Sequence, residues 1–361
     1  MSSPITLSCP LPAADLFFAA MTAVQGLSVI EEFELDLLSE KPDLEPEKLL
    51  GQNMDVAVTL PDGGTRHFNG VVMRFGIAPS QGRYYAYRAS VRPWLWFLTR
   101  TADCKVFQDL SVPDIVEKVF GDHTVANFKF SLDRSYRKRV YCVQYRETDF
   151  NFVARLLEEE GIYWYFEHSD GAHKLILVDD PSHHEMAPTC EALPFYGNQG
   201  QVPPEMDYIG SWSFSREVQT GQVASTSYDF ERPSVTLAVD EAQPREHELS
   251  DYEQFDFQGE YTVKEDGSQL VRNRVDELQS SHERLSGSTN AHGLAVGWRF
   301  ALTRHAREDQ NAEYLCTQSR IIARVNGHES GNLVGDYMCS FGALRGARKA
   351  MVESSAVKRQ L

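Results

Sequence analysis

The sequence lacks the short motifs that mark most nucleotide-binding and metal-dependent enzymes. It contains no P-loop, no G-x-G-x-x-G and no C-x-x-C pair. Two partial matches to H-E-x-x-H, at His247 and His282, have Asp and Ser in place of the second His, so neither can put two imidazoles on one helical face. In Gly327–Gly331 the serine stands one position too late for a G-x-S-x-G nucleophile elbow, and we interpret this segment as a turn. We therefore expect no catalytic, cofactor-binding or metal-ligating residues and no cofactor.

An excess of positive charge is also missing. The chain has 35 Lys and Arg against 52 Asp and Glu, which gives a net charge of -17. Because a chain this acidic repels a phosphate backbone, we expect no nucleic-acid partner.

Long apolar runs are absent as well. No stretch approaches 18 consecutive apolar residues, so we expect no stable membrane insertion. The first residues carry no basic segment, and the apolar run Leu16–Ala20 is too short for a secretory signal. We expect assembly in the cytoplasm and export, into the medium or a target cell, without a Sec signal.

Cysteines are few and widely spaced. The six are Cys9, Cys104, Cys142, Cys190, Cys316 and Cys339. Because no two of them have the spacing of a metal or redox pair, we expect small, reduced and mostly buried side chains rather than disulfides or a zinc site.

The residues that are present suffice for two or three folded domains. The chain has 361 residues, of which 42% are hydrophobic. Phe33–Leu37 alternates with period two, and 61–64 is a strong turn signal, which together are typical of a barrel or sandwich. The predicted divisions are a first barrel-like domain at 1–93, an α+β domain at 94–200, a second barrel-like domain at 201–341 with a helical insertion at about 240–290, and a short tail at 342–361.

Several local predictions accompany this division. Leu44–Leu50 is predicted to be a short helix. A hairpin is predicted to turn at Thr220-Gly221, and the polar, acidic residues 240–257 are predicted to be a loop. The apolar stripe within Asp266–Leu285 predicts one long helix that ends before Gly287.

The most informative pattern lies in residues 136–168, which read as a strand, a helix and a strand. Thr148 or Asp149 can cap the helix, and Gly161 follows it where a left-handed residue is needed. Ile162–Phe166 is aromatic and β-branched, as strands are. The apolar residues with helical spacing are Phe150, Val153, Ala154 and Leu157.

The same stretch also carries a specific order of residue types. It reads Gln144-Tyr145-x-Glu147-x-Asp149-x-x-Phe152-x-x-Arg155-Leu156, followed by Glu159-Glu160-Gly161-Ile162 and Phe166. This order resembles the signature of the VgrG family, the spike proteins of type VI secretion, which are similar to the hub protein of contractile phage tails. Further family segments, within about residues 5–341, are Leu50-Gly51, Phe68-x-Gly70-x-Val72, Arg92-Pro93-Trp94-Leu95, Phe107-Gln108, Arg272-x-Arg274, Gly297-x-x-Phe300-x-Leu302-x-x-His305 and Tyr314-Leu315-x-Thr317.

The resemblance implies a fold and a set of partners. The implied fold is α+β and predominantly β, with two barrel-like tube domains and α+β insertions, as in phage tail hubs. It also implies a homotrimer whose six barrels match the hexameric Hcp tube, with baseplate proteins and effectors or adaptors as further partners. The implied function is the structural hub of a secretion spike that helps to deliver effectors.

The chain departs from the family after residue 341. Family members continue into an OB-fold and a β-helical needle, whereas Gly342–Leu361 is rich in Ala, Arg and Lys. The sequence therefore resembles the hub without the shaft. A phage or prophage tail hub remains an alternative, and a hydrolase acting on cell wall or glycan is an alternative of another class.

Several charged and imidazole side chains are candidates for a catalytic or metal-binding role. Glu158–Glu160 is interpreted as a solvated helix end, because neighbouring carboxylates do not share a helix face. His183-His184-Glu185 is interpreted as a solvated loop rather than a metal site. His168 and His173 flank a predicted turn and are expected to be exposed. Glu147, Asp149 and Arg155 are interpreted as capping and packing residues.

Overall fold

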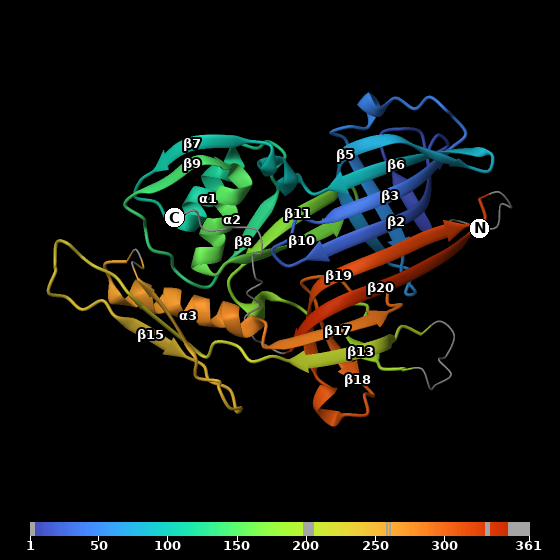
Figure 1. The fold of residues 1–361 in the computed structure, drawn as a ribbon. Coiled ribbons are helices and arrows are strands. Elements are labelled where there is room, and N and C mark those ends of the chain that lie inside the picture. The colour runs from blue at the N-terminus through green and yellow to red at the C-terminus, as the bar shows by residue number, and fades with distance from the viewer. Residues whose placement is uncertain (1–3, 198–205, 258, 260, 329–332, 346–361) are drawn as a thin grey trace.

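The computed structural model describes residues 4–197, 206–257, 259, 261–328 and 333–345. A sheet of 12 strands forms the right-hand part of Figure 1. In spatial order its main path is β1 (Ile5–Ser8), β4 (Asn53–Thr59), β5 (Thr65–Gln81), β6 (Tyr84–Arg92), β3 (Glu32–Ser39), β2 (Phe17–Gly26), β19 (Glu313–Asn326), β20 (Val334–Arg345), β17 (Glu283–Thr289) and β13 (Ile209–Arg216). Strand β18 (Arg299–Thr303) pairs with β19 and with β12 (Ala192–Pro194).

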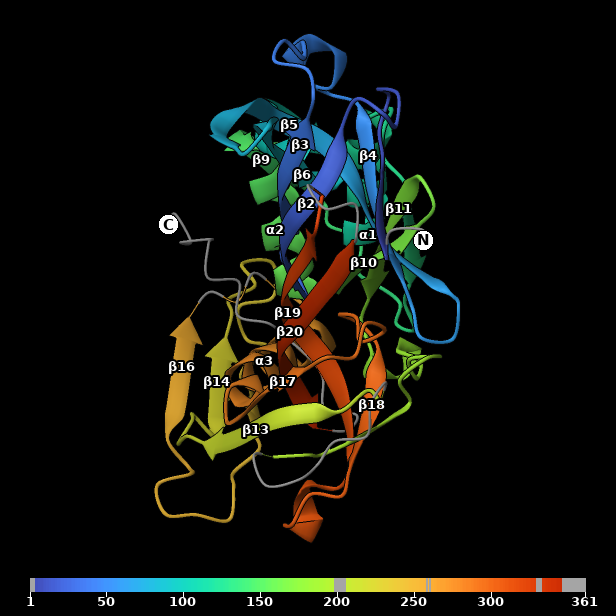
Figure 2. The same ribbon diagram turned by 90° about the vertical axis from the view of Figure 1, so that its right-hand side faces the viewer.

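The N-terminal and C-terminal strands meet where β2 pairs with β19. The two strands are antiparallel, with Gln318 opposite Gly26 and Arg324 opposite Ala20. In Figure 2 the long strands β19 and β20 run beside β2 through the middle of the molecule. One hydrophobic core also spans both groups of strands and includes Phe33 and Phe300. The two proposed tube domains therefore share one sheet and one core.

The α+β unit lies at the upper left of Figure 1 and has a separate core. Its elements are β7 (Ala102–Phe107), α1 (Val112–Gly121), β8 (Phe128–Ser131), β9 (Cys142–Thr148), α2 (Asp149–Glu160), β10 (Tyr163–Ser169) and β11 (Ala172–Val178), preceded by a 3-10 turn at Trp94–Thr99. Strands β7 and β9 pair, and β10, β11 and β8 form a second sheet. The β10–β11 hairpin extends from this unit and packs against β5.

Helix α2 begins and ends as the sequence predicts. The Thr148 hydroxyl accepts a hydrogen bond from the backbone N–H of Asn151 at 3.1 Å, so Thr148 rather than Asp149 is the cap. Gly161 has φ of +69°, which confirms the left-handed end. Phe152 and Leu156 are both 0% exposed, and the Phe152 ring stacks on Phe107 at 5.5 Å.

A third unit at the lower left of Figure 1 corrects two predictions. It contains β14 (Gln222–Thr226), β15 (Val239–Ala242), β16 (Glu253–Phe257) and α3 (Lys264–Ser280). The hairpin predicted at Thr220-Gly221 is wrong, because β13 pairs with β17 whereas β14 pairs with β15 and β16. The loop predicted for 240–257 is also wrong at both ends, where the acidic residues lie on edge strands.

The predicted helix Asp266–Leu285 is too long. Helix α3 ends at Ser280, and Leu285 and Gly287 lie in β17, opposite Ala343 and Phe341 of β20. A Cβ on Gly287 would lie 2.7 Å from both the Phe341 ring and the Ser211 carbonyl oxygen. This glycine therefore allows close strand packing and is not a helix stop.

Three smaller segments complete the description. Leu44–Leu50 contains only a 3-10 turn at Pro46–Lys48, and similar turns lie at Pro181–His183 and Glu308–Gln310. Residues 342–345 continue β20, whereas the predicted tail included them; the rest of that tail, and Glu329–Gly331 of the predicted turn, lie outside the described residues. No helix within the described ranges is long and apolar enough to span a membrane.

Truncating the buried face of α2 is expected to destabilise the protein. Phe152→Ala or Leu156→Ala should each lower the free energy of unfolding by about 2–5 kcal/mol, because each leaves a cavity in a fully packed core. Urea denaturation followed by circular dichroism measures the change. Asn151→Ala, on the exposed side of the same helix, is the control and should stay within about 0.5 kcal/mol of wild type. Equal stability of all three variants would contradict the packing described here.

Candidate assembly surface

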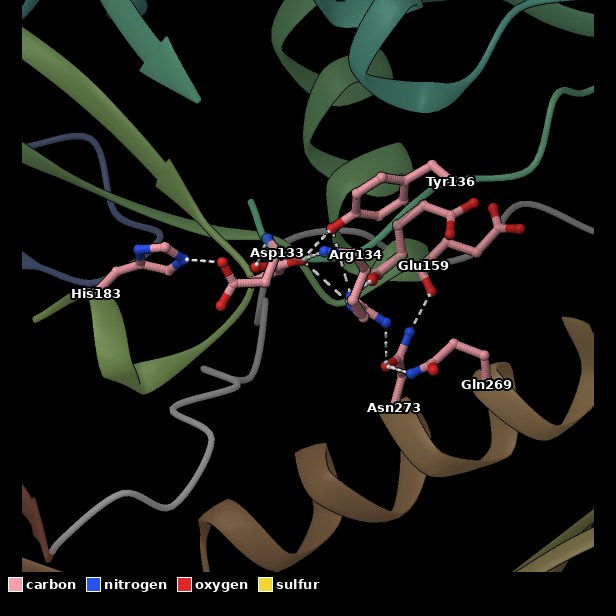
Figure 3. Close-up of polar contacts among 9 residues, drawn as sticks. Asp133, Arg134, Tyr136, Glu159, His183, Gln269 and Asn273 are labelled. Carbon is pink, nitrogen blue, oxygen red and sulfur yellow. Dashed lines mark hydrogen bonds and ion pairs between the residues drawn. The ribbon is translucent and has the colours of Figure 1, made fainter. Parts of the chain in front are cut away.

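The C-terminal end of α2 meets α3 through polar contacts (Figure 3). Asn273 of α3 is buried; its side-chain N–H donates to the Glu159 carbonyl oxygen at 3.2 Å, and its Oδ1 accepts from Gln269 at 2.9 Å. A Cβ on Gly161 would lie 2.9 Å from the Asn273 side chain. Gly161 is therefore required twice, for the left-handed backbone and for the approach of α3.

Arg134 joins the end of α2 to the end of β11 (Figure 3). Its Nη2 donates to the Glu160 carbonyl oxygen at 2.6 Å, and its Nε donates to Asp179 at 3.3 Å. Asp179 also accepts from the Tyr136 hydroxyl at 2.8 Å and from the backbone N–H groups of Asp133 and Arg134. Burial opposes the charge on Asp179, but these hydrogen bonds outweigh it and lower the pKa. The contacts place a cation at the negative end of the helix dipole.

The acidic residues at the end of α2 are paired rather than solvated. Arg139 lies 2.9 Å from both the Glu159 and the Glu160 carboxylates, and Arg137 lies 3.5 Å from Glu159. Glu160 is 7% exposed, so the prediction of a solvated helix end is wrong for this residue. The reason is that arginines from the segment before β9 cover it, which the local spacing did not reveal.

The other charged residues of the signature also have structural partners. Asp149 accepts from Thr101 at 2.6 Å and from Gln144 at 2.7 Å. Burial raises the pKa of Asp149, but these hydrogen bonds more than compensate and the net shift is downward. Arg155 pairs with Glu147 at 2.8 Å. These contacts support the interpretation of Glu147, Asp149 and Arg155 as packing groups, whereas the cap of α2 is Thr148.

The His168 side chain is 6% exposed and His173 is buried where the β10–β11 hairpin packs on β5, so the prediction that both are exposed is wrong. His168 lies 2.7 Å from Glu31 through Nε2, and its Nδ1 accepts from the backbone N–H of Asn69 at 3.2 Å. His173 accepts from the backbone N–H of Trp94 at 2.8 Å and lies 2.8 Å from Asn69 Oδ1. Because a backbone N–H can only donate, each imidazole is held in one neutral tautomer.

Arg66 connects these histidines to the C-terminal half. It donates to the carbonyl oxygens of His292 and Leu294 at 2.8 and 2.6 Å, to the Tyr337 hydroxyl at 3.0 Å and to Gln25 Oε1 at 3.0 Å. Gln25 in turn donates to Glu31 at 2.9 Å. We call Arg66, Gln25, Glu31, His168, Asn69 and His173 the Arg66 network. The sequence does not predict the Arg66 network, because the residues of the network come from distant stretches and share no local pattern.

The His183-His184-Glu185 segment divides between surface and interior. Glu185 is exposed, as a solvated loop predicts, but His184 is 1% exposed and contradicts that prediction. His184 lies 2.7 Å from the Gly297 carbonyl oxygen and 2.9 Å from the Tyr163 hydroxyl. Burial lowers the pKa of His184 to about 4. His183 points to Asp133 at 3.1 Å (Figure 3).

A group of exposed aromatic side chains lies on the third unit. Its members, which we call the aromatic edge, are Tyr228, Phe230, Tyr252, Phe255 and Phe257, each at least 58% exposed. β16 is an end strand of its sheet, and the apolar residues Val223 and Val239 turn toward α3 on the other face. Such a surface is typical of interaction sites. The alternation of Tyr228 with Phe230 and of Phe255 with Phe257 is the sequence signal for this surface.

A groove of about 460 Å³ lies between α3 and the end of β20. Arg134, Arg245, Arg272 and Arg345 line it together with Asp179, Asp180, Asp276 and Glu283. Because side chains of both charge signs line it, the groove does not favour an anionic or a cationic ligand.

Comparison with known proteins identifies the family. The model of the phage tail baseplate hub (GPD) family matches residues 25–327. The chain belongs to the phage tail baseplate hub family. The match covers the α+β unit, the third unit and most of the large sheet, and it leaves out β1, most of β2 and β20.

Several curated relatives are spike proteins. The chain is 41% identical to the type VI secretion system spike protein VgrG1b of Pseudomonas aeruginosa over 91% of its own length and 44% of that protein. It is 39% identical to VgrG1a of the same organism over 91% of its length and 51% of that protein. These values confirm the predicted resemblance to VgrG. The chain spans about half the length of the curated relatives it matches.

Solved structures show the same fold. The E. coli c3393 protein, a type VI secretion component described as similar to the phage T4 tail proteins gp27 and gp5, matches with a TM-score of 0.69 at 19% identity, over 95% of this chain and 78% of that one. A tail protein from Neisseria meningitidis matches with a TM-score of 0.66 at 12% identity, over 96% of this chain and 98% of that one. The prediction of a predominantly β, hub-like α+β fold is confirmed.

Replacing Gly161 is expected to weaken the contact between α2 and α3. Gly161→Ala should lower the free energy of unfolding by at least about 1–2 kcal/mol, because Ala is strained in the left-handed region and its Cβ meets Asn273. The matched control is Gly121→Ala at the end of α1, where an added Cβ has no neighbour within 4 Å. Denaturant unfolding compares the two, and an equal loss in both variants would rule out this role for Gly161.

The buried His173 predicts a loss of stability in acid. Burial lowers the pKa of His173 from 6.5 to about 3. The unfolded chain therefore binds a proton below pH 6.5 that the folded chain does not, so stability is present above pH 6.5 and falls as the pH drops toward 3. His173→Gln should reduce the slope of unfolding free energy between pH 6 and 5 by roughly 1 kcal/mol per pH unit. Urea unfolding at each pH tests this, and an unchanged slope would contradict it.

Proposed function

We propose that this chain is a structural subunit of the hub at the base of a type VI secretion spike. The observation that carries the proposal is the 41% identity to a spike protein over 91% of the chain, which includes the shared sheet and both smaller units. A sheet that joins two barrel-like halves provides a rigid body for a ring, because neither half can move without breaking the β2–β19 ladder. The subunit would leave the cell with the spike.

We further propose that three copies assemble and that the ring they form caps the Hcp tube. Two barrel-like halves per copy give six around a trimer, which matches a hexameric tube by symmetry. The aromatic edge is proposed as a contact between copies. It supports this because its apolar side chains have no cover within the described part of the chain, and burial in an assembly would remove them from water. Baseplate proteins and effectors or adaptors would use other faces.

The proposed role is structural rather than catalytic. The carboxylates and imidazoles of the signature stretch are hydrogen-bonded to structural partners, and none of those described forms a nucleophile–base pair aimed into the groove. A hydrolase is the competing proposal. Hydrolysis of cell wall that Glu159→Gln abolishes while the fold stays intact would favour it. A phage tail hub is the other alternative, and capsid and terminase genes beside this gene would favour that origin.

The assembly proposal predicts a defined oligomer. Light scattering on the purified chain alone should give the mass of three copies, and mixing the chain with Hcp should give a larger complex that contains three copies. Changing Phe255 and Phe257 together to Ser should shift the mass to one copy while the circular dichroism spectrum is retained, because the exposed rings do not contribute to the core. Ile77→Ser removes an equally exposed apolar side chain from β5 and should leave the trimer intact. A wild-type monomer in the presence of Hcp would refute the hub role.

A further inference from the structure

Three metal-ligating side chains meet at the contact between the first strands and the α+β unit. Asp55 lies on β4, His67 on β5, and Asp170 in the turn between β10 and β11. One ligand atom from each residue lies within 4.8 Å of the other two. Because Asp170 is about 100 residues from the other two, only the folded chain brings the three together.

Asp55 is a buried carboxylate with too few partners. Its side chain is 3% exposed, and its Oδ2 lies 2.7 Å from His67 Nδ1. Its Oδ1 has no hydrogen-bond partner in the described structure. Among the described residues, the Asp55 carboxylate has its one hydrogen bond with His67, which belongs to the same cluster. A buried carboxylate oxygen without a partner is costly, and a cation would satisfy it.

We propose that Asp55, His67 and Asp170 bind a divalent transition-metal ion, for which Zn²⁺ is the best-suited representative. An imidazole with two carboxylates suits zinc and its neighbours better than Ca²⁺ or Mg²⁺, which prefer oxygen ligands alone. The three ligands leave a fourth position for water. The role is structural, because the ion would tie the β10–β11 hairpin to β4 and β5 beside the Arg66 network.

The present distances require only small movements. Zinc bonds of about 2.0–2.2 Å in a tetrahedral site place ligand atoms roughly 3.3–3.6 Å apart. The Asp55–His67 hydrogen bond would open from 2.7 Å, and Asp170, an exposed turn residue, would move inward. The ion would take the place of the hydrogen bond between Asp55 and His67, so the His67 ring would carry its proton on Nε2.

A second cluster serves as an internal control. Asp133, Asp179 and His183 also bring three ligand atoms within 4.8 Å of one another. There, however, Asp179 already accepts from two backbone N–H groups, from Arg134 and from Tyr136. Its carboxylate is satisfied without an ion, so this cluster gives no reason to expect binding.

The experiment uses the full chain after treatment with EDTA and removal of the chelator. Calorimetric titration with ZnCl₂ should show one strong site per chain, and the ion should raise the melting temperature. His67→Gln and Asp55→Asn should each weaken binding at least tenfold, since each removes a ligand. Asp133→Asn, in the second cluster, should bind as wild type does.

Three outcomes would overturn the proposal. They are the absence of a one-to-one site in wild type, unchanged binding in His67→Gln, and loss of binding in Asp133→Asn. Unchanged binding in His67→Gln would assign the metal to other histidines. Asp170→Asn keeps the proposal testable if the two buried variants do not fold, because Asp170 is exposed and Asn is compatible with the same turn. Its binding should also weaken, and unchanged binding in a folded Asp170→Asn chain would overturn the site.

Discussion

The way the first strands, the C-terminal strands and the α+β unit meet depends on the hydrogen bonds around Arg66. A guanidinium that is partly removed from water needs acceptors, and Arg66 finds them on β2, on β20 and on the segment before β18. Gln25 donates a hydrogen bond to Glu31, and Glu31 lies beside His168 of the α+β unit. A shift of any one part would leave a buried polar group unpaired, at about 1–3 kcal/mol for each group. The network therefore fixes how the parts meet.

The β2–β19 ladder depends on this fixed geometry. Backbone pairing alone allows a strand to slip, and a slip of one residue would turn every side chain to the opposite face. Gln25 of β2 is held by Arg66 and Glu31 and lies 3.5 Å from the hydroxyl of Ser319 on β19. The polar contacts thus select one register for the pairing that joins the two halves into one sheet.

Local chemistry made part of this structure predictable. Thr148, Gly161 and the helical spacing of Val153, Ala154 and Leu157 determine α2 within a few residues, so the prediction of this helix succeeded. The prediction that His168 and His173 are exposed failed because their partners, Glu31 and Trp94, lie far away in the sequence. The predicted C-terminal boundary of α3 was wrong for a related reason. Helical spacing continues past Ser280, but the following residues form β17, which pairs with β20 in the large sheet.

Contacts within the chain do not explain why the side chains of the aromatic edge are exposed. Helix α3 already covers the apolar residues on one face of its small sheet, so stability of the monomer gives no reason for Phe255 and Phe257 on the end strand. End strands usually avoid exposed apolar side chains, because unpaired backbone groups beside them invite association. Glu253 and Asp256 add negative charge to the same strand, which opposes indiscriminate stacking while leaving the rings exposed. Exposed apolar rings flanked by negative charges suit a specific, symmetric assembly better than they suit a surface that stays in contact with water.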